Sequence, residues 1–314
     1  MWIYALRRIG LAVLIISVAM ALLFGMIYLV PGDPASIALG PRASPEMKEA
    51  LKVKMGLDQP LPLQFFYFFR NMLQGDLGID VWSNRSVTVI VFEQLPYTLA
   101  LTLLGLGWAI FIGIPMGCYS AIRRNSFLDK VTGIFSVSVI AIPSFVVAIY
   151  SLLVFAVALR WLPAIGAGEP GDPVDQFRHL LLPSLAIGLG WVGYLARLVR
   201  ASMLEVLGEN YIRTARAFGL PDHVIVFRYA LNLAILPTVT LLGVGVGNLL
   251  SGAVFAEIVF ARPGIGKLIF DAVITRNYPV VMGSVLVTIG LFVMATLIAD
   301  LFIAWLDPRV RASL

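Results

Sequence analysis

Charged side chains gather in one short segment of an otherwise apolar chain. Residues 208–228, GENYIRTARAFGLPDHVIVFR, hold three arginines, two acids and one histidine. Across all 314 residues, by contrast, 13% are charged and 60% are hydrophobic. Arginines and acids at this density can bind an acidic surface, an anionic lipid or another protein. The first question is therefore what this segment contacts, and which elements hold it.

Catalytic chemistry finds little support elsewhere in the chain. PGIGKL at residues 263–268 resembles the end of a phosphate-binding loop, but that pattern needs glycine where Ala261 stands and serine or threonine where Leu268 stands. With one cysteine, Cys118, and two histidines, His179 and His223, neither an intrachain disulfide nor a zinc site is predicted. We expect no enzyme activity, no metal and no cofactor in this chain.

The remaining sequence predicts an all-α polytopic membrane protein. The mean hydropathy is +0.92, and six apolar stretches each approach or exceed the roughly 20 residues that a membrane-spanning helix needs. Continuous apolar runs without alternation exclude a β-barrel. We place the six transmembrane helices at about residues 9–30, 97–120, 131–159, 180–200, 233–258 and 279–305.

Basic residues set the orientation of these helices. Short loops on one side carry most of the lysines and arginines, including Arg7, Arg8, Arg123 and Arg124, which predicts that both termini are cytoplasmic. Residues 205–232 then form a cytoplasmic loop, and residues 31–96 form an extracytoplasmic insertion in one membrane domain, 1–314. The net charge of +5 is scattered over loop ends, so we read it as a topology signal and expect no nucleic-acid partner.

The insertion and the fifth predicted span carry local signals. Ser44 is a predicted N-cap, Pro45 a first helical residue and Gly56 a stop, while the aromatic helix after residue 60 is too short to span. In the fifth span, glycines at 243, 245, 247 and 252 predict close helix packing. The alternative is a pathway-lining helix that offers Asn248 and Ser251, with Glu257 near its outer end as a third candidate.

Within the charged segment, spacing predicts a helix–glycine–helix hairpin. Tyr211, Ala215 and Phe218 fall within one narrow stripe at 100° per residue, opposite Glu209, Arg213 and Arg216. Glu209 precedes Arg213 by four residues, the favourable order for a helical ion pair. Gly219 is the predicted stop and Pro221 the predicted start of the next helix. The stripe suits a groove in another protein, whereas a solvated loop whose arginines meet anionic membrane lipid is the alternative.

YIRTARAFG followed by ILP resembles the cytoplasmic loop of bacterial ABC importer permeases. Arg213-Thr214-Ala215 stand where the general pattern has Glu-Ala-Ala, and the spacing from Gly219 to Pro237 is longer, as in the dipeptide/oligopeptide/nickel subfamily. Further resemblances run in family order along nearly the whole chain: VPGDP, GLDQPLPLQ, QGDLG, QLPYTL, IPSF, WLPAIG, LLPSL, FARPGIGKL, RNYPVV and LDPR. The long insertion is similar to that of the first, B-type, permease.

The resemblance implies a type I ABC importer permease fold in a bacterial inner membrane. It implies four kinds of partner: a second permease, two ATP-binding subunits that hydrolyse ATP, an extracytoplasmic binding protein and membrane lipid. The implied coupling residues are Glu209, Tyr211, Arg213, Thr214, Ala215, Arg216, Phe218 and Gly219. Dipeptides or oligopeptides are the expected substrates, with nickel chelate, glutathione or another small solute as alternatives. An ion-coupled carrier and a non-transporting scaffold are the alternatives from other classes, and sparse intramembrane charge disfavours the carrier.

Overall fold

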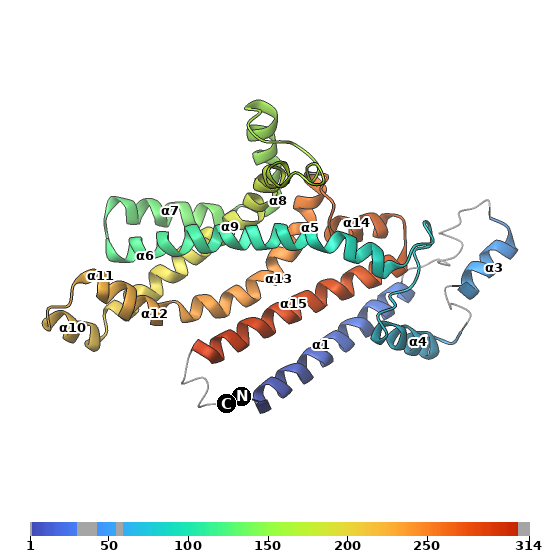
Figure 1. Cartoon of the computed structure of the whole chain (residues 1–314), viewed down its shortest axis with the longest axis horizontal. Coiled ribbons are helices and arrows are strands. Elements are labelled where there is room, and N and C mark those ends of the chain that lie inside the picture. Colours follow the sequence, from blue (N-terminus) through green and yellow to red (C-terminus); the bar gives the residue numbers. More distant parts are fainter. Residues whose placement is uncertain (1, 30–42, 55–58, 307–314) are drawn as a thin grey trace. The chain divides into compact units, whose positions relative to one another are not determined.

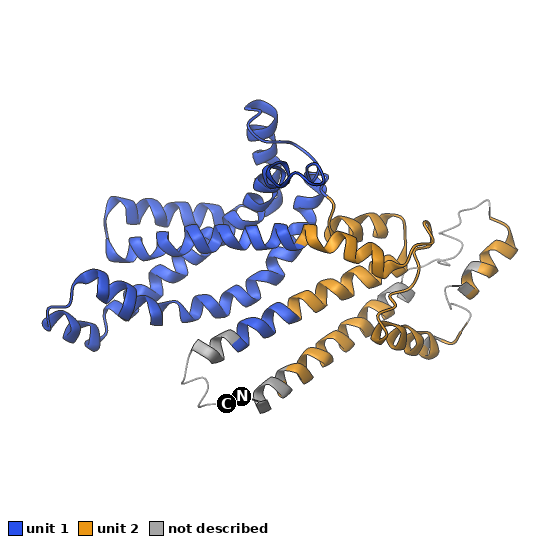
Figure 2. Cartoon of the chain, in the orientation of Figure 1, with its two compact units in different colours: residues 1–5, 99–262, 294–314 blue, residues 6–98, 263–293 orange. Residues whose placement is uncertain are grey.

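The computed structural model describes residues 2–29, 43–54 and 59–306, and over those residues it is built from helices (Figure 1). This confirms the all-α prediction. The predicted motifs VPGDP and most of LDPR lie outside the described residues, as does the predicted stop at Gly56. The chain divides into two compact units, residues 1–5, 99–262 and 294–314 in one and residues 6–98 and 263–293 in the other (Figure 2).

Four helical segments are long and apolar enough to cross a membrane: Val87–Ile122, Pro173–Leu207, Leu236–Val259 and Tyr278–Leu301. The first comprises α5 (Val87–Trp108), a π-helical turn at Ala109–Gly113 and α6 (Ile114–Ile122). The others are α9 (Pro173–Leu207), α13 (Leu236–Val259) and α15 (Tyr278–Leu306). The first predicted span lies in α1 (Trp2–Leu29), whose described apolar part is the shorter Ile9–Gly25.

The third predicted span, 131–159, is not one straight helix. It consists of α7 (Phe127–Ala141), α8 (Ser144–Ser151) and a π-helical turn at Leu152–Ala158, with a bend of 99° between the two parts. Pro143 causes the break because it forces the residue before it out of the helical region. Ile142 accordingly has the extended ψ of 122°. Counted as one bent span, the pair brings the candidate spans to five among the described residues.

Helix α9 lies at the centre of the larger unit. Its packing depends on glycines that bring backbones together. A Cβ at Gly188 would lie 2.5 Å from the carbonyl oxygen of Gly105 in α5, and one at Gly117 in α6 would lie 2.5 Å from that of Ala196. In α13, where we predicted close packing, Gly243 faces Ala299 of α15 and Gly245 faces the ring of Trp191. Close packing is therefore confirmed for Gly243 and Gly245. In each case the nearest atom belongs to a side chain of the neighbouring helix.

Among its described residues, the smaller unit holds three short helices and a polar turn. α3 (Pro45–Lys54) begins as predicted, since Ser44 Oγ accepts a hydrogen bond from the amide of Met47 at 3.2 Å. α4 (Leu61–Leu73) carries the aromatic run, and α14 (Ile265–Ile274) begins within the PGIG segment. Between α4 and α5, residues 75–86 form a turn around Asp80, called here the Asp80 turn.

Side-chain hydrogen bonds hold the Asp80 turn. The carboxylate of Asp80 accepts hydrogen bonds from the amides of Trp82 and Ser83, at 3.1 and 3.2 Å, from the hydroxyl of Ser83 and from the side-chain amide of Asn277. Burial of Asp80 acts to raise its pKa, but the hydrogen bonds from Ser83, Asn277 and Trp82 outweigh burial and lower the pKa. A buried carboxylate thus joins a turn to a residue nearly two hundred positions away.

Candidate coupling segment and pathway helix

The charged segment leaves the end of α9 and forms a compact hairpin, residues 208–230, called here the α10 hairpin (Figure 1). It contains α10 (Asn210–Ala217), α11 (Asp222–Val224) and a π-helical turn at Ile225–Ala230, and α12 (Leu231–Ala234) leads from it to α13. Pro221 stands at the N-cap of α11, as predicted. The segment therefore lies between two candidate spans and outside both.

Gly219 ends α10 through a paired backbone motif. The amide of Gly219 donates to the carbonyl of Arg216 at 2.9 Å, and the amide of Leu220 donates to the carbonyl of Ala215 at 3.2 Å. This 5→2 and 6→1 pattern is the Schellman motif, which requires a left-handed residue after the helix. Gly219 has φ +76°, so its predicted role as the stop is confirmed.

Two different apolar edges run along α10. Ile212 and Ala215 are buried, at 0% and 8% exposure, whereas Tyr211 and Phe218 are exposed at 40% and 83%. The prediction that Ala215 shares an outward stripe with Tyr211 and Phe218 is therefore wrong. Ile212 and Ala215 are three residues apart and so share one helix edge, and that edge is the one that packs inward.

The inward edge joins a core built from several helices. Ile212 and Ala215 pack in one cluster with Cys118 and Ala121 of α6, Val199 and Met203 of α9, Ile225, Val226 and Ala230 of the π-helical turn and Ala234 of α12. Complete burial of one large aliphatic side chain stabilises by about 1.5–3 kcal/mol. The hairpin is thus anchored to the ends of α6 and α9 by hydrophobic contacts.

The charged residues of α10 are exposed and do not form the predicted pair. Glu209 and Arg213 make no ion pair with each other. Glu209 is the N-cap residue, with ψ 150°, so it lies outside the helical geometry that an i,i+4 pair needs. Arg213, Thr214 and Arg216 are also exposed. Thr214 donates its hydroxyl hydrogen bond to the carbonyl of Asn210 at 3.1 Å.

The ring of Tyr211 stays neutral over an extended pH range. Partial burial is the main cause that raises the pKa of Tyr211, and the negative charge of Glu209 adds to it. The raised pKa extends the protonated, hydrogen-bond-donating form of this phenol to higher pH. Together, Tyr211 and Phe218 give the exposed edge of the hairpin two aromatic side chains among arginines.

The three candidate pathway residues on α13 separate into two faces. Asn248 and Ser251 are exposed and lie on one stripe with exposed Val244 and Phe255, at 48% and 53%. Glu257 is fully buried. Nine residues at 100° each turn the helix by about 180° between Asn248 and Glu257, which puts Glu257 on the opposite side. The structure therefore groups Asn248 with Ser251 and excludes Glu257 from their face.

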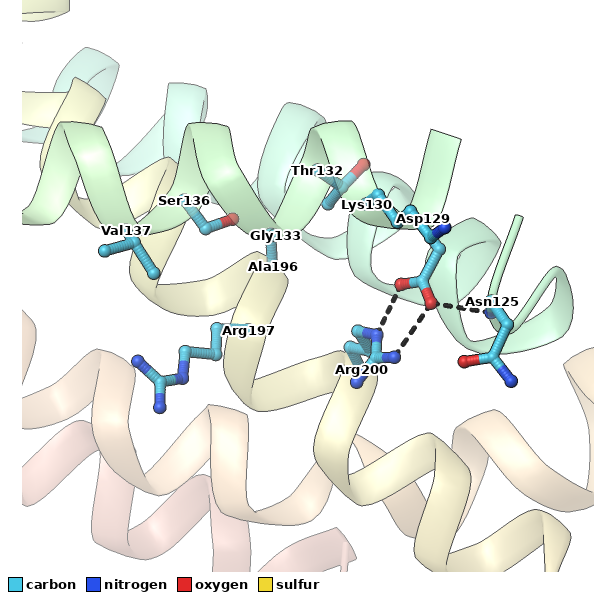
Figure 3. Close-up of a pocket in the computed structure, with 10 residues that line it drawn as sticks. All are labelled: Asn125, Asp129, Lys130, Thr132, Gly133, Ser136, Val137, Ala196, Arg197 and Arg200. Carbon is cyan, nitrogen blue, oxygen red and sulfur yellow. Dashed lines mark hydrogen bonds and ion pairs between the residues drawn. The ribbon is translucent and has the colours of Figure 1, made fainter. Parts of the chain in front are cut away.

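Sequence reasoning missed one charged contact in the larger unit. Asp129, near the start of α7, accepts hydrogen bonds from Arg200 of α9, Nε at 2.6 Å and Nη2 at 2.9 Å (Figure 3). The hydroxyl of Ser120 and the amide of Asn125, the latter at 2.9 Å, also donate to this carboxylate. The partners are 71 residues apart. The available signal was local: Asp129 lies in the first turn of a helix that Ser126 caps.

Within the described residues, no group of three or more His, Cys, Asp or Glu side chains could hold a metal ion. Cys118 is buried as a free thiol in the cluster beneath α10. His179 contacts the backbone carbonyl of Asp175 at 2.8 Å and belongs to α9. The candidate functional features are therefore the exposed edge of the α10 hairpin and the polar face of α13.

Comparisons with known proteins agree with this architecture. The chain is 34% identical to the dipeptide transport system permease protein of Alkalihalophilus pseudofirmus, with 98% of this chain and 99% of the relative covered. It is 37% identical to the glutathione transport system permease protein of Pectobacterium atrosepticum, with 98% of each covered. A chain of the inward-facing MetNI methionine ABC transporter shares the fold, with a TM-score of 0.56 and 18% identity over 69% of this chain and 96% of that chain.

Two family matches cover most of the sequence. Residues 1–102 match the N-terminal family of binding-protein-dependent transport system membrane components. Residues 113–312 match the family described as binding-protein-dependent transport system inner membrane component. The second match alone covers more than half of the chain and includes the α10 hairpin and α13. This chain is an integral membrane permease and belongs to the family of binding-protein-dependent transport system inner membrane components.

Proposed function

We propose that this chain is the first of two permease subunits of an ATP-driven importer for dipeptides or oligopeptides. In this proposal an extracytoplasmic binding protein delivers the solute, two ATP-binding subunits hydrolyse ATP, and both termini are cytoplasmic. The relative named for dipeptide transport supports the substrate class. The charge of the α10 hairpin and of the loop at Arg123 and Arg124 supports the orientation.

The observation that carries the coupling role is the two-edged character of α10. One edge is buried with the ends of α6 and α9, while the other presents Tyr211 and Phe218. A rigid segment with these two edges can transmit a movement of a docked subunit to the spans. Glu209, Arg213, Thr214 and Arg216 surround the aromatic side chains as a polar rim, and Gly219 fixes the end of the helix. Ala215 acts in this scheme from the inside, by holding the hairpin to the core.

On α13 we propose that Asn248 and Ser251 face the solute pathway. Both are exposed and polar, whereas Glu257 of the same helix is buried, and the serine hydroxyl donates to the carbonyl of Gly247 at 3.1 Å. That internal bond satisfies the hydroxyl proton and leaves its lone pairs for a passing donor. Glu257 is not part of this face.

Glutathione is the second candidate substrate, because a relative named for glutathione transport is 37% identical to this chain. The test is ATP hydrolysis by the reconstituted transporter with its binding protein, measured with a dipeptide, a tetrapeptide and glutathione in turn. The proposal expects stimulation by the peptides. Stimulation by glutathione alone would make glutathione the substrate in place of peptides and leave the importer function intact. Strong ATP hydrolysis by this chain without ATP-binding subunits would contradict the permease function itself.

Single cysteines test the orientation. In a Cys118→Ala background, Leu73→Cys lies at the exposed last residue of α4 and Arg124→Cys lies in the exposed loop before α7. On spheroplasts, an impermeant maleimide should label residue 73 and spare residue 124. The reverse pattern would invert the topology and exclude the α10 hairpin from contact with cytoplasmic ATP-binding subunits.

A further inference from the structure

A pocket of about 380 Å³ opens between α7 and α9, beside the Asp129–Arg200 contact (Figure 3). This volume is within the range of about 300–1,000 Å³ that small-molecule sites occupy. Every residue that lines it belongs to the larger unit. Neither the coupling role of α10 nor the pathway face of α13 uses the pocket.

The pocket has an excess of positive charge. Asp129 and Arg200 neutralise each other through their two hydrogen bonds. Lys130 and Arg197 also line the pocket, and within the described part of the chain neither forms an ion pair. Two uncompensated cations at one pocket favour an anionic ligand.

A buried hydroxyl lines the same pocket without a partner. Ser136 is 2% exposed, and its Oγ has no hydrogen-bond partner among the described residues. Figure 3 shows this hydroxyl on α7, directed into the space between α7 and α9. A Cβ at Gly193 of α9 would lie 2.8 Å from the carbonyl oxygen of Ser136, so the two backbones meet closely beside this hydroxyl. A buried polar group without a partner is costly, and an acceptor oxygen on a ligand would satisfy it.

The surroundings of the pocket are apolar. On α7, Phe127, Ile134 and Val137 are exposed at 79%, 70% and 55%, and Val137 lines the pocket itself. A cationic pocket that continues into an apolar helix surface fits a ligand with an anionic head and a hydrocarbon tail. Basic pockets between membrane helices bind anionic lipid head groups in this way.

We propose that the α7–α9 pocket binds the phosphodiester of an anionic phospholipid. Lys130 and Arg197 contact the phosphate oxygens, and Ser136 donates its hydroxyl hydrogen bond to one of them. The acyl chains lie along exposed Ile134 and Val137, which follow Lys130 on α7. The lipid phosphodiester and free inorganic phosphate both present phosphate oxyanions, so inorganic phosphate is the competing ligand.

The glycine at position 133 makes the pocket testable without a change of charge. Gly133 lines the pocket, and a Cβ added there would meet no atom within 4 Å. Gly133→Leu should therefore fill the pocket and leave the fold intact, since leucine favours a helix more than glycine does. Gly290→Leu is the matched control, because Gly290 is also helical with open space around its Cβ.

The experiment is native mass spectrometry of the purified full transporter titrated with dioctanoyl phosphatidylglycerol, dioctanoyl phosphatidylcholine or inorganic phosphate. Wild type should bind phosphatidylglycerol at a saturable site and phosphatidylcholine much more weakly. Gly133→Leu should abolish that site, and the Lys130→Gln/Arg197→Gln double variant should weaken it about tenfold or more. Gly290→Leu should bind as wild type does.

A second double variant, Arg123→Gln/Arg124→Gln, removes two charges from the neighbouring loop and leaves the pocket unchanged. It should retain the saturable site. Equal loss in both double variants would overturn the proposal in favour of diffuse attraction to basic loops. Saturation by inorganic phosphate with no gain from the lipid would overturn the lipid as the ligand, and unchanged binding in Gly133→Leu would overturn the pocket as the site.

Discussion

The α10 hairpin and the Asp80 turn are both held to the helices beside them, but by opposite means. The hairpin carries exposed charges and is anchored by an apolar cluster around Ile212. The turn has exposed Ile79 and Trp82, at 49% and 58%, and is anchored by hydrogen bonds to a buried carboxylate. The comparison shows that the exposed composition of a segment does not reveal what holds it. It also implies that only one of the two anchors depends on pH.

Ile212→Ala should produce the largest effect. Large-to-small substitution of a fully buried aliphatic residue costs about 2–5 kcal/mol, so the hairpin should open locally while the spans stay folded. Hydrogen exchange of the α10 amides in the detergent-purified membrane subunits measures this. Phe218→Ala, at an 83% exposed position, should change exchange little, and equal exchange in the two variants would contradict the inward-edge assignment.

Asp80→Asn should loosen the Asp80 turn by a smaller amount. The substitution keeps the shape but removes the charge that strengthens several hydrogen bonds, a loss of about 1–3 kcal/mol. Exchange of the Trp82 and Ser83 amides reports it. The control is Asp271→Asn, which removes an exposed pair with Lys267 and should cost no more than about 1 kcal/mol. No difference between the two variants would mean that the carboxylate does not anchor the turn.

Gly219→Ala should destabilise the end of α10 by about 1–2 kcal/mol, because alanine adopts the left-handed conformation poorly. Gly219→Asn should lose less, since asparagine tolerates that region. Exchange at Leu220, whose amide donates to Ala215, measures both. If alanine and asparagine behaved alike, the positive φ would not be the reason for glycine at this position.

Lowering the pH should have the smallest effect, and it should weaken the anchor of the Asp80 turn and leave the apolar anchor of the α10 hairpin unchanged. The folded pKa of Asp80 is lowered, so its contribution to stability is complete above the ordinary value of 3.8 and is lost as pH falls through the folded pKa. Just below pH 3.8 only part of it is lost. Tryptophan fluorescence between pH 6 and pH 2 should show a change that is absent in Asp80→Asn and in Trp82→Phe. Wild type and Asp80→Asn with identical profiles would remove Asp80 as the titrating group.

Local patterns in the sequence predicted local structure correctly. Apolar runs located the helices, the Ser44–Pro45 pair located the start of α3, and Gly219 located the end of α10. These features depend on residues close together in the chain. The run at 131–159 was read as continuous because hydropathy alone does not show that Pro143 bends it.

The errors concern which way a side chain faces. The stripe of Tyr211, Ala215 and Phe218 omits Ile212, the partner of Ala215 on the inward edge, and so wrongly places Ala215 outward. Glu257 shares a predicted span with Asn248, but the two residues lie on opposite sides of α13. The Asp129–Arg200 contact depends on how α7 packs against α9, and that packing is set by glycines such as Gly193. One sequence contains no direct record of such pairings.

If an ATP-binding subunit covers the exposed edge of α10, residue 218 should be shielded in the full transporter. Phe218→Cys and Phe127→Cys, made separately in a Cys118→Ala background, replace two phenylalanines of nearly equal exposure, 83% and 79%. Maleimide labelling is measured on the membrane subunits alone and on the full transporter. Addition of the ATP-binding subunits should protect residue 218 and leave residue 127 labelled. Equal labelling of residue 218 with and without those subunits would contradict that coverage.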